Sequence, residues 1–173
     1  MKTNNVFIKI KDISFIELLI SALLIEFIVL FFLFFSSKVQ EIVRDSIRKR
    51  EVSQIGRIIT NPCFIPNQIA NKREYDLSLI LKEIGEKDDI YQSTVSQRIK
   101  DPQTGTEKIS MYIYKISENG QECSLYANLE SPFNKETLEI TDPTPGEGIG
   151  ILKSTADGWN GSPFYFQYSN QLK

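Results

Sequence analysis

Residues 13–35 read ISFIELLISALLIEFIVLFFLFF, an apolar run whose only charged residues are Glu17 and Glu26. A helix of about 20 apolar residues crosses the hydrocarbon core of a bilayer. An ionised side chain at the bilayer centre costs at least ~2.5–3.5 kcal/mol on insertion scales, so an acid inside such a run needs a reason to be there. We therefore expect a transmembrane helix over 13–35 and a specific partner for Glu17.

The segment before the run, residues 1–12, is basic, with Lys2, Lys9 and Lys11 against a single acid, Asp12. A positive segment before an apolar run is typical of a signal peptide. The apolar run is longer than the usual ~7–15 apolar residues of a signal peptide, however, and no small-x-small cleavage site follows it. We therefore expect the helix to be retained in the membrane.

The helical pattern continues beyond the apolar run, through residues 36–61. Apolar residues recur there at steps of three to five positions, at Val39, Ile42, Val43, Ile47, Val52, Ile55 and Ile59, with polar and charged residues between them. This spacing predicts an amphipathic helix with one apolar face. Asn61-Pro62 ends it, because the residue before a proline is disfavoured in the helical conformation.

Residues 62–173 are predicted to form a soluble head that begins with a short helix. Asp76 is a suitable N-cap for this helix, and Gly85 is expected to close it. A short strand around Tyr91–Ile99 is one interpretation of an ambiguous stretch. Asp101–Gly105 (DPQTG) predicts a turn, since proline presets the bend and glycine accepts a positive φ.

The strongest local signal is a β-hairpin. Lys108–Ser117 is rich in β-branched and aromatic residues, and Cys123–Glu130 alternates apolar and polar positions. Asn119-Gly120 between them is the preferred centre of a type I′ turn. A long loop, residues 131–163, then precedes a last alternating strand, residues 164–169. We predict an α+β fold in which the long N-terminal helix packs against a small C-terminal antiparallel sheet.

Composition argues against several classes of function. The chain has 20 basic and 22 acidic residues and no histidine. Without a basic block, nucleic-acid binding has no support. The commonest general base is missing, and no nucleophile, phosphate-binding or Cys-x-x-Cys motif is present. We expect no enzymatic activity.

The chain has two cysteines, Cys63 and Cys123, and both follow the apolar run. A disulfide between them would close a long loop, and such bonds persist in oxidising compartments. The alternative is that both are small buried thiols in a reducing compartment. A disulfide would favour a head outside the cytoplasm.

Ser14–Ile20 (SFIELLI) resembles the N-terminal motif of type IV pilins and type II secretion pseudopilins. In that family a short basic leader precedes a phenylalanine, a Thr or Ser, two apolar residues and a glutamate. Here Glu17 matches the glutamate and Ser14 the Thr/Ser. The later order of a long helix, a D-P-x-T-G turn, a Tyr-rich hairpin and a terminal aromatic strand also resembles the family. The fold implied is pilin-like.

The resemblance implies a structural subunit, pilin or pseudopilin, of a type IV pilus-like or type II secretion-like filament. Glu17 would meet the N-terminal amine of a neighbouring pilin-like subunit. A prepilin peptidase would cut between Asp12 and Ile13, and Ile13 would then be methylated. The chain would span the cytoplasmic membrane once, with its head outside the cytoplasm, before entering a surface filament.

Two positions depart from the family motif. Asp12 stands where glycine usually precedes the cut, and Ile13 stands where phenylalanine is usual. Glu26 has no assigned counterpart. These departures leave an alternative function open, namely a single-span, membrane-anchored extracytoplasmic binding module that does not polymerise.

Calcium is a possible ligand, because some pseudopilins hold Ca²⁺ in loops of this region. The loop 131–163 carries five acids, Glu136, Glu139, Asp142, Glu147 and Asp157. Oxygen-rich loops suit Ca²⁺, but these acids follow no fixed ligand spacing. We therefore expect no metal or other cofactor.

Overall fold

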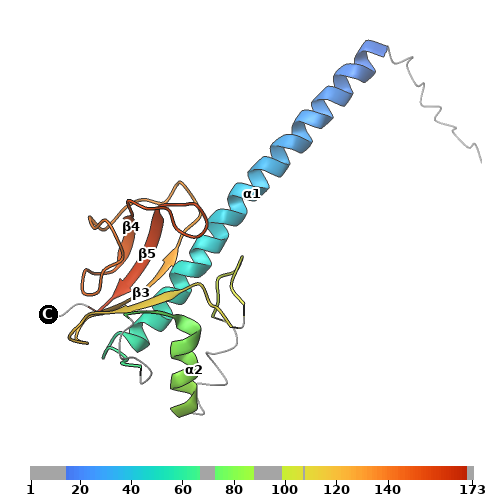
Figure 1. Ribbon diagram of the computed structural model, residues 1–173. Coiled ribbons are helices and arrows are strands. Elements are labelled where there is room, and N and C mark those ends of the chain that lie inside the picture. Colours follow the sequence, from blue (N-terminus) through green and yellow to red (C-terminus); the bar gives the residue numbers. More distant parts are fainter. Residues whose placement is uncertain (1–14, 67–72, 88–98, 107, 171–173) are drawn as a thin grey trace, which may run out of the picture. The chain divides into compact units, whose positions relative to one another are not determined.

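A computed structural model describes residues 15–66, 73–87, 99–106 and 108–170, and Figure 1 shows its elements. The chain divides into two units, residues 1–39 and 40–173. Helix α1 (Phe15–Ile59) begins in the first unit and ends in the second. The α+β class, the long apolar N-terminal helix and the small antiparallel sheet are confirmed.

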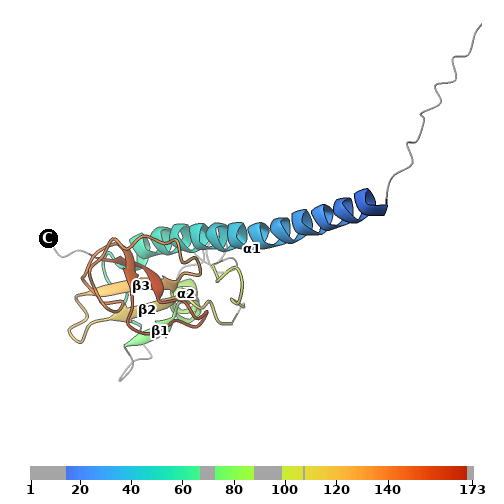
Figure 2. The same cartoon turned by 90° about the horizontal axis from the view of Figure 1, so that it is seen from above.

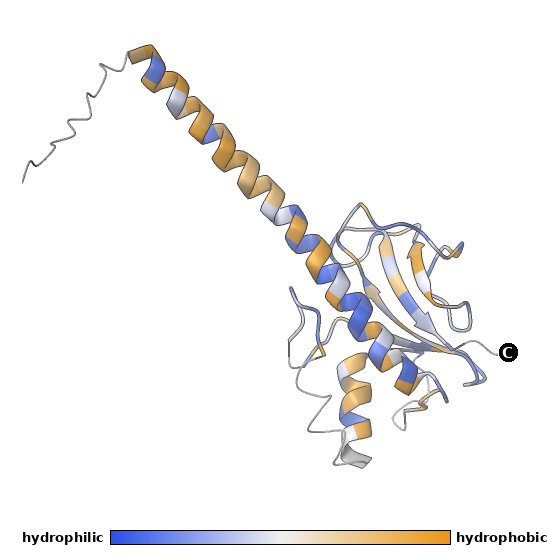
Figure 3. Ribbon diagram, turned by 180° about the vertical axis from the view of Figure 1, so that it is seen from behind, coloured by the Kyte–Doolittle hydropathy of each residue, from blue (hydrophilic) through white to orange (hydrophobic). Residues whose placement is uncertain are grey.

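Helix α1 is a single element of 45 residues. Figure 3 shows that its N-terminal part is mostly apolar, interrupted by hydrophilic positions that include Glu17 and Glu26, and that hydrophilic residues become frequent after it. The helix ends as expected before Asn61-Pro62, and Thr60 donates to the Gly56 carbonyl from both its backbone N–H (2.9 Å) and its hydroxyl (2.7 Å). The expected helix start, Ile13, lies outside the described residues.

The sheet lies wholly in the second unit, and every pair of neighbouring strands is antiparallel. Its strand order is β1-β2-β3-β5-β4, and Figure 2 shows β1, β2 and β3 in this order. The strands are β1 (Glu74–Asp76), β2 (Ile113–Ile116), β3 (Cys123–Asn128), β4 (Gly150–Lys153) and β5 (Phe164–Ser169). The last strand has the predicted bounds, whereas β1 and β4 were not predicted. Both are very short, and β4 lies within the segment expected to be one long loop.

One face of the sheet and the C-terminal part of α1 share the hydrophobic core. Val52, Ile55 and Ile59 are buried with Tyr114 and Leu125. Gly56 brings β5 close to the helix, because a Cβ at this position would lie 2.5–2.9 Å from atoms of the Tyr168 side chain. A real Cβ requires more room than that, so only glycine allows this approach without a shift.

The opposite face of the sheet carries polar side chains that hold residues 131–163 in place. The Gln167 side-chain oxygen accepts from the Thr144 N–H (2.7 Å), and the Ser169 hydroxyl accepts from the Gly146 N–H (2.6 Å). Asn128 donates to the carbonyls of Ser162 and Phe164 at 2.9 and 2.8 Å. Because buried backbone groups need partners, these side chains let an irregular segment cover the sheet.

Helix α2 (Leu77–Lys87) begins where predicted, and the Asp76 carboxylate accepts from the Ser78 N–H (2.9 Å) at its first turn. The prediction that Gly85 closes the helix is wrong, because α2 continues to Lys87. Gly85 is buried inside the helix. The possible strand around 91–99 lies outside the described residues, apart from Ile99.

The hairpin of β2 and β3 is present, with Ile113 opposite Tyr126 and Ile116 opposite Cys123. The predicted type I′ turn is wrong, since that turn needs a positive φ at Asn119 and only Gly120 has one (φ 70°). Residues 118–121 form a four-residue loop instead, closed by Ser117 N–H donating to Glu122 (2.9 Å). The Asn119 side-chain oxygen accepts from the Gln121 N–H (3.1 Å), which stabilises this other conformation.

Candidate functional site

The candidate functional site is the apolar part of α1, residues 15–35. Every side chain in this range is exposed, including Phe15 at 78% and Phe27 at 69%. Soluble monomers rarely expose a contiguous apolar surface of more than a few hundred Å². Within the described residues, α1 is long and apolar enough to cross a membrane. Its surface therefore needs lipid or other apolar helices around it.

Glu17 lies in the first turn of α1 as described. A carboxylate there is favoured by the helix dipole, because the N-terminal end of a helix is partly positive. Ser21, one turn on, donates its hydroxyl to the Glu17 backbone carbonyl (2.7 Å). Asp12 and Ile13, the possible processing site, lie outside the described residues, so cleavage stays a prediction.

A second group of charged residues lies inside the head. We call Arg48, Asp45, Asp101 and Glu130 the Arg48 cluster. The Arg48 side chain has 0% exposure, and its guanidinium contacts all three acids. Its Nη1 is 2.9 Å from Asp45, and its Nη2 donates to Asp101 at 3.0 Å. Buried charges are tolerated only when they are paired and hydrogen-bonded in this way.

Asp45 fastens the end of β3 to α1. Its two carboxylate oxygens accept from the backbone N–H groups of Glu130 (2.8 Å) and Ser131 (2.9 Å), and from the side-chain amide of Asn134 (2.8 Å). These donors come from one short segment that follows β3. A single carboxylate therefore fixes the position of this segment along the helix.

The predicted turn at Asp101–Gly105 is present, but Gly105 does not have the expected positive φ. Asp101 holds this turn against the same helix. Its carboxylate accepts from the backbone N–H groups of Gln103 (2.9 Å) and Thr104 (3.0 Å) as well as from Arg48. Burial on its own would raise the pKa of Asp101, but the Arg48 guanidinium and the two backbone donors lower it by more. Asp101 is therefore held ionised beside Arg48.

Trp159 lies over the Arg48 guanidinium, whose central carbon is 5.5 Å from the ring centroid. This geometry is a cation–π contact. The Trp159 segment is held against the sheet by Asn128, which accepts from the Asn160 N–H (3.3 Å) and donates to Ser162. Arg48 thus joins the helix to a third segment of the head.

The sequence pattern predicted that the charged residues of this part of α1 lie outside its buried face. That prediction is wrong for Asp45 and Arg48, which are both buried. Ile42 and Val43, which were assigned to the apolar face, are 47% and 52% exposed. The spacing of residues along the helix does indicate that these two charges are buried. Stepping back from Ile59, Ile55 and Val52 by alternating three and four residues leads to Arg48 and then Asp45, so all five share one helix face.

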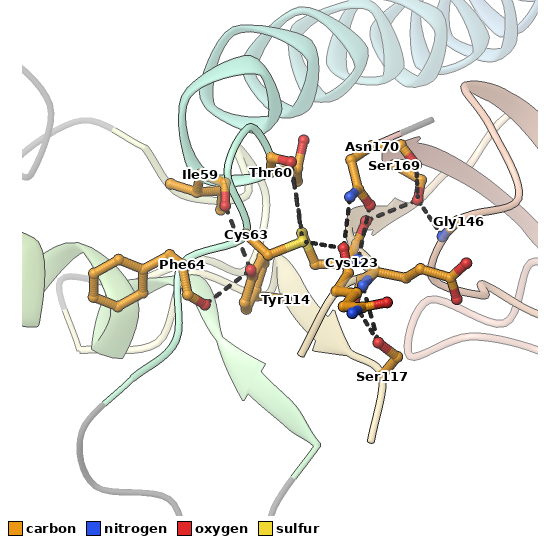
Figure 4. The surroundings of a disulfide bond; sticks show 12 residues. Ile59, Thr60, Cys63, Phe64, Tyr114, Ser117, Cys123, Gly146, Ser169 and Asn170 are labelled. Atoms are coloured by element: carbon orange, nitrogen blue, oxygen red, sulfur yellow. Dashed lines mark hydrogen bonds between the residues drawn. A yellow bond between two sulfur atoms is a disulfide. The ribbon is translucent and has the colours of Figure 1, made fainter. Parts of the chain in front are cut away.

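A disulfide joins Cys63, just after α1, to Cys123 at the start of β3, with the two Cα atoms 5.8 Å apart (Figure 4). The same region is tied by Tyr114, whose hydroxyl donates to the Phe64 carbonyl (3.0 Å). On the other side of the bond, Ser169 donates to the Cys123 carbonyl (2.7 Å). The end of α1 is therefore held to β2, β3 and β5 together.

The acids of the loop 131–163 do not gather around a common point. Asp142 accepts from the Ser154 hydroxyl (2.7 Å). Among the described residues, no group of three or more His, Cys, Asp or Glu side chains is placed to hold a metal ion. In the Arg48 cluster, three acids do converge, but a guanidinium occupies the position between them. The absence of a metal stays a prediction.

No protein-family model, curated protein or solved structure matches this chain.

Proposed function

We propose that this chain is a structural subunit, pilin-like or pseudopilin-like, of a type IV pilus-like or type II secretion-like filament. One observation carries the proposal. Residues 15–35 of α1 expose an apolar surface whose only charged residues are Glu17, in the first turn, and Glu26, whereas the same helix ends in the core of a separately folded head. The exposed part is the part available for assembly.

The physics of Glu17 supports an ordered assembly. A carboxylate in an apolar environment is costly alone and much less so beside a cation. The N-terminal amine of a cleaved neighbouring subunit is such a cation. Because the pair forms at only one axial offset between two helices, it selects one register over the others. A head-to-tail contact of this kind repeats without closing and builds an open helical assembly.

Before assembly, the same apolar surface would hold the subunit in the membrane. Lipid and neighbouring helices are both apolar, so a helix can pass from one to the other without exposing its surface to water. We propose a single-pass protein of the cytoplasmic membrane with its head outside the cytoplasm. The disulfide supports this side, since such bonds persist in oxidising compartments.

The test replaces Glu17 with Ala in the full chain in its native host. We expect Glu17→Ala to insert into the membrane as well as the wild type, because an acid has been removed from the apolar run. Its recovery in sheared filaments should fall at least tenfold, which corresponds to a loss of ~1.4 kcal/mol of contact energy. Glu139→Ala, at an exposed acid of the head, is the matched control and should assemble normally.

A second function is favoured by one observation, Asp12 in the position before the expected cut. If the peptidase does not accept Asp12, the basic leader stays and the N-terminal amine is not freed at Ile13. The chain would then be a permanent anchor that presents the head as an extracytoplasmic binding module. Equal filament recovery for wild type and Glu17→Ala, or a monodisperse full-length protein with a soluble ligand, would support this function over the first.

A further inference from the structure

Glu26 lies near the middle of the apolar part of α1, and its side chain is exposed. The nine positions that follow, residues 27–35, are all apolar, so the first polar residue in that direction is Ser36. At 1.5 Å per residue, Ser36 is about 15 Å away along the helix axis, and Phe15, where the described helix begins, is about 17 Å away in the other direction. A glutamate side chain is far shorter than either distance, so it cannot reach water from an apolar surrounding.

The two acids of the apolar segment point in opposite directions. They are nine positions apart, which is two and a half turns of a helix with 3.6 residues per turn. Glu26 is therefore on the face opposite Glu17. One neighbouring helix therefore cannot contact both carboxyl groups. A helix that contacts the Glu17 carboxyl group leaves the Glu26 carboxyl group to be contacted by a different helix.

Each acid has a small residue one turn away on its own face. Ser21 is four positions after Glu17, and Ala22 is four positions before Glu26. Small residues let the backbones of two helices in an apolar surrounding approach closely. Both faces thus combine a carboxyl group with space for a neighbouring helix, which is what a contact between helices requires.

The chemistry of the neighbour follows from the charges of the chain. Residues 13–35 contain no Lys, Arg or His, so a second copy at the same depth presents only another Glu26 to the first. The nearest basic residue within the described helix, Lys38, is about 18 Å away along the axis, and Lys11 is 15 positions away in the sequence. A second copy therefore offers no cation there without a large axial displacement.

We infer that Glu26 docks against an apolar helix of a different protein that carries a lysine or arginine at this depth. The inference rests on the proposed function in one respect, since it makes this neighbour another subunit of the same filament. The chain would then stand between two unlike neighbours, one facing Glu17 and one facing Glu26. A subunit of this kind occupies a defined place in an assembly of several different subunits.

The test places a photoreactive side chain at Ala22, on the Glu26 side of the helix, in the full chain in membranes of the native host. Ser21, about 100° around the helix and nearer the Glu17 face, is the matched position. We expect light to link position 22 to a second protein, and the linked peptide to lie in an apolar segment that contains Lys or Arg. Glu26→Leu should lower this yield about tenfold, as expected for the loss of ~1.4 kcal/mol. The yield from position 21 should not change with Glu26→Leu.

Four results would overturn the inference: a homodimer linked through position 22, a linked segment without Lys or Arg, a yield at position 22 that Glu26→Leu does not change, or no product at position 22. The proposed function fails on a different result, the absence of the chain from sheared filaments. If position 22 forms the expected cross-link but the chain never enters filaments, the proposed filament function is wrong and the inferred Glu26 contact is still supported.

Discussion

Arg48 is surrounded by acids inside the head, and its side chain has no exposed surface. Removing one partner of a buried ion pair leaves the others charged and without compensation, which costs about 3–5 kcal/mol. Arg44 also contacts Glu130, at 3.0 Å, but it cannot replace Arg48 between Asp45 and Asp101. The stability of the head should therefore depend strongly on this one guanidinium.

We expect Arg48→Met, which keeps most of the side-chain volume, to lower the free energy of unfolding by about 3–5 kcal/mol. Urea denaturation of the full chain in detergent measures this change. Arg57→Met, at an exposed position of the same helix, is the control and should change stability by less than ~0.5 kcal/mol. Equal effects of the two substitutions would show that the Arg48 cluster contributes nothing specific.

Two acids of the head, Asp76 and Asp101, have a pKa below the ordinary value of 3.8. For Asp76, burial acts to raise the pKa, and hydrogen bonds from Ser78 and Ser110 lower it by more. The folded state therefore binds fewer protons than the unfolded state around this pH. By linkage, these acids stabilise the fold above about pH 4, and the stabilisation is lost as pH falls through their folded pKa values.

We expect the free energy of unfolding to fall steadily as pH is lowered from 5 to 2. Asp76→Asn should flatten this dependence and should cost about 1–3 kcal/mol at pH 7, since an amide cannot accept from both Ser78 and Met111 as the carboxylate does. Urea titrations at several pH values test this. Asp157→Asn, at an exposed acid, should keep the wild-type slope; a slope unchanged by Asp76→Asn would contradict the assignment.

At the scale of elements, the features predictable from the sequence are those that repeat over several residues. The alternation in residues 164–169 predicted β5, and Asn61-Pro62 predicted the end of α1. Strands β1 and β4 have three and four residues, too few for a period to be recognised. The turn at Asn119 was predicted wrongly because side-chain hydrogen bonds, which the dipeptide preference does not include, select its conformation.

The buried charges of α1 were missed for a different reason. An amphipathic pattern assumes that a buried face is apolar, and Asp45 and Arg48 break that assumption by pairing with acids and donors far away in sequence. Only Val52, Ile55 and Ile59 of the predicted stripe are buried. The spacing of these three residues predicts the buried face better than the full apolar stripe does. The helical period of the buried face continues through charged positions when the partners for those charges lie on other segments.

The contact between α1 and β5 depends on Gly56. We expect Gly56→Ala to lower the free energy of unfolding by about 1–3 kcal/mol, because its Cβ would overlap the Tyr168 ring. On an exposed helix position the same change would stabilise by up to ~1 kcal/mol. Gln54→Ala, at an exposed position two residues earlier, is the control, and urea denaturation compares them. A stabilising Gly56→Ala would contradict this packing.

At the scale of the whole molecule, the two ends of α1 differ: one end is packed in the core of the head, and the other end is exposed. Residues 40–173 have their own core, buried ion cluster and disulfide. Residues 15–35 instead present an exposed and mostly apolar surface. A head that is stable by itself leaves the apolar segment free to exchange lipid for other helices, which is the property that a polymerising subunit requires.

The disulfide should contribute substantially to the head. Cys63 and Cys123 are 60 residues apart. In the chain-entropy model, a bond that closes a loop of this length stabilises by about 4 kcal/mol. We expect dithiothreitol to lower the urea midpoint of the wild type and to leave a Cys63→Ala/Cys123→Ala variant, already at the lower midpoint, unchanged. A wild-type midpoint that is insensitive to the reductant would contradict this expectation.

The central claim is that the chain is a filament subunit, and the most direct measurement is the intact mass of the chain in two fractions from its native host, membranes and sheared filaments. The account predicts the chain in the filament fraction, with a mass that lacks Met1–Asp12 and includes a methyl group on Ile13. A full-length chain within filaments would show that the predicted cleavage after Asp12 is wrong and that the filament function is right. A full-length chain found only as a monomer in the membrane fraction would contradict the account.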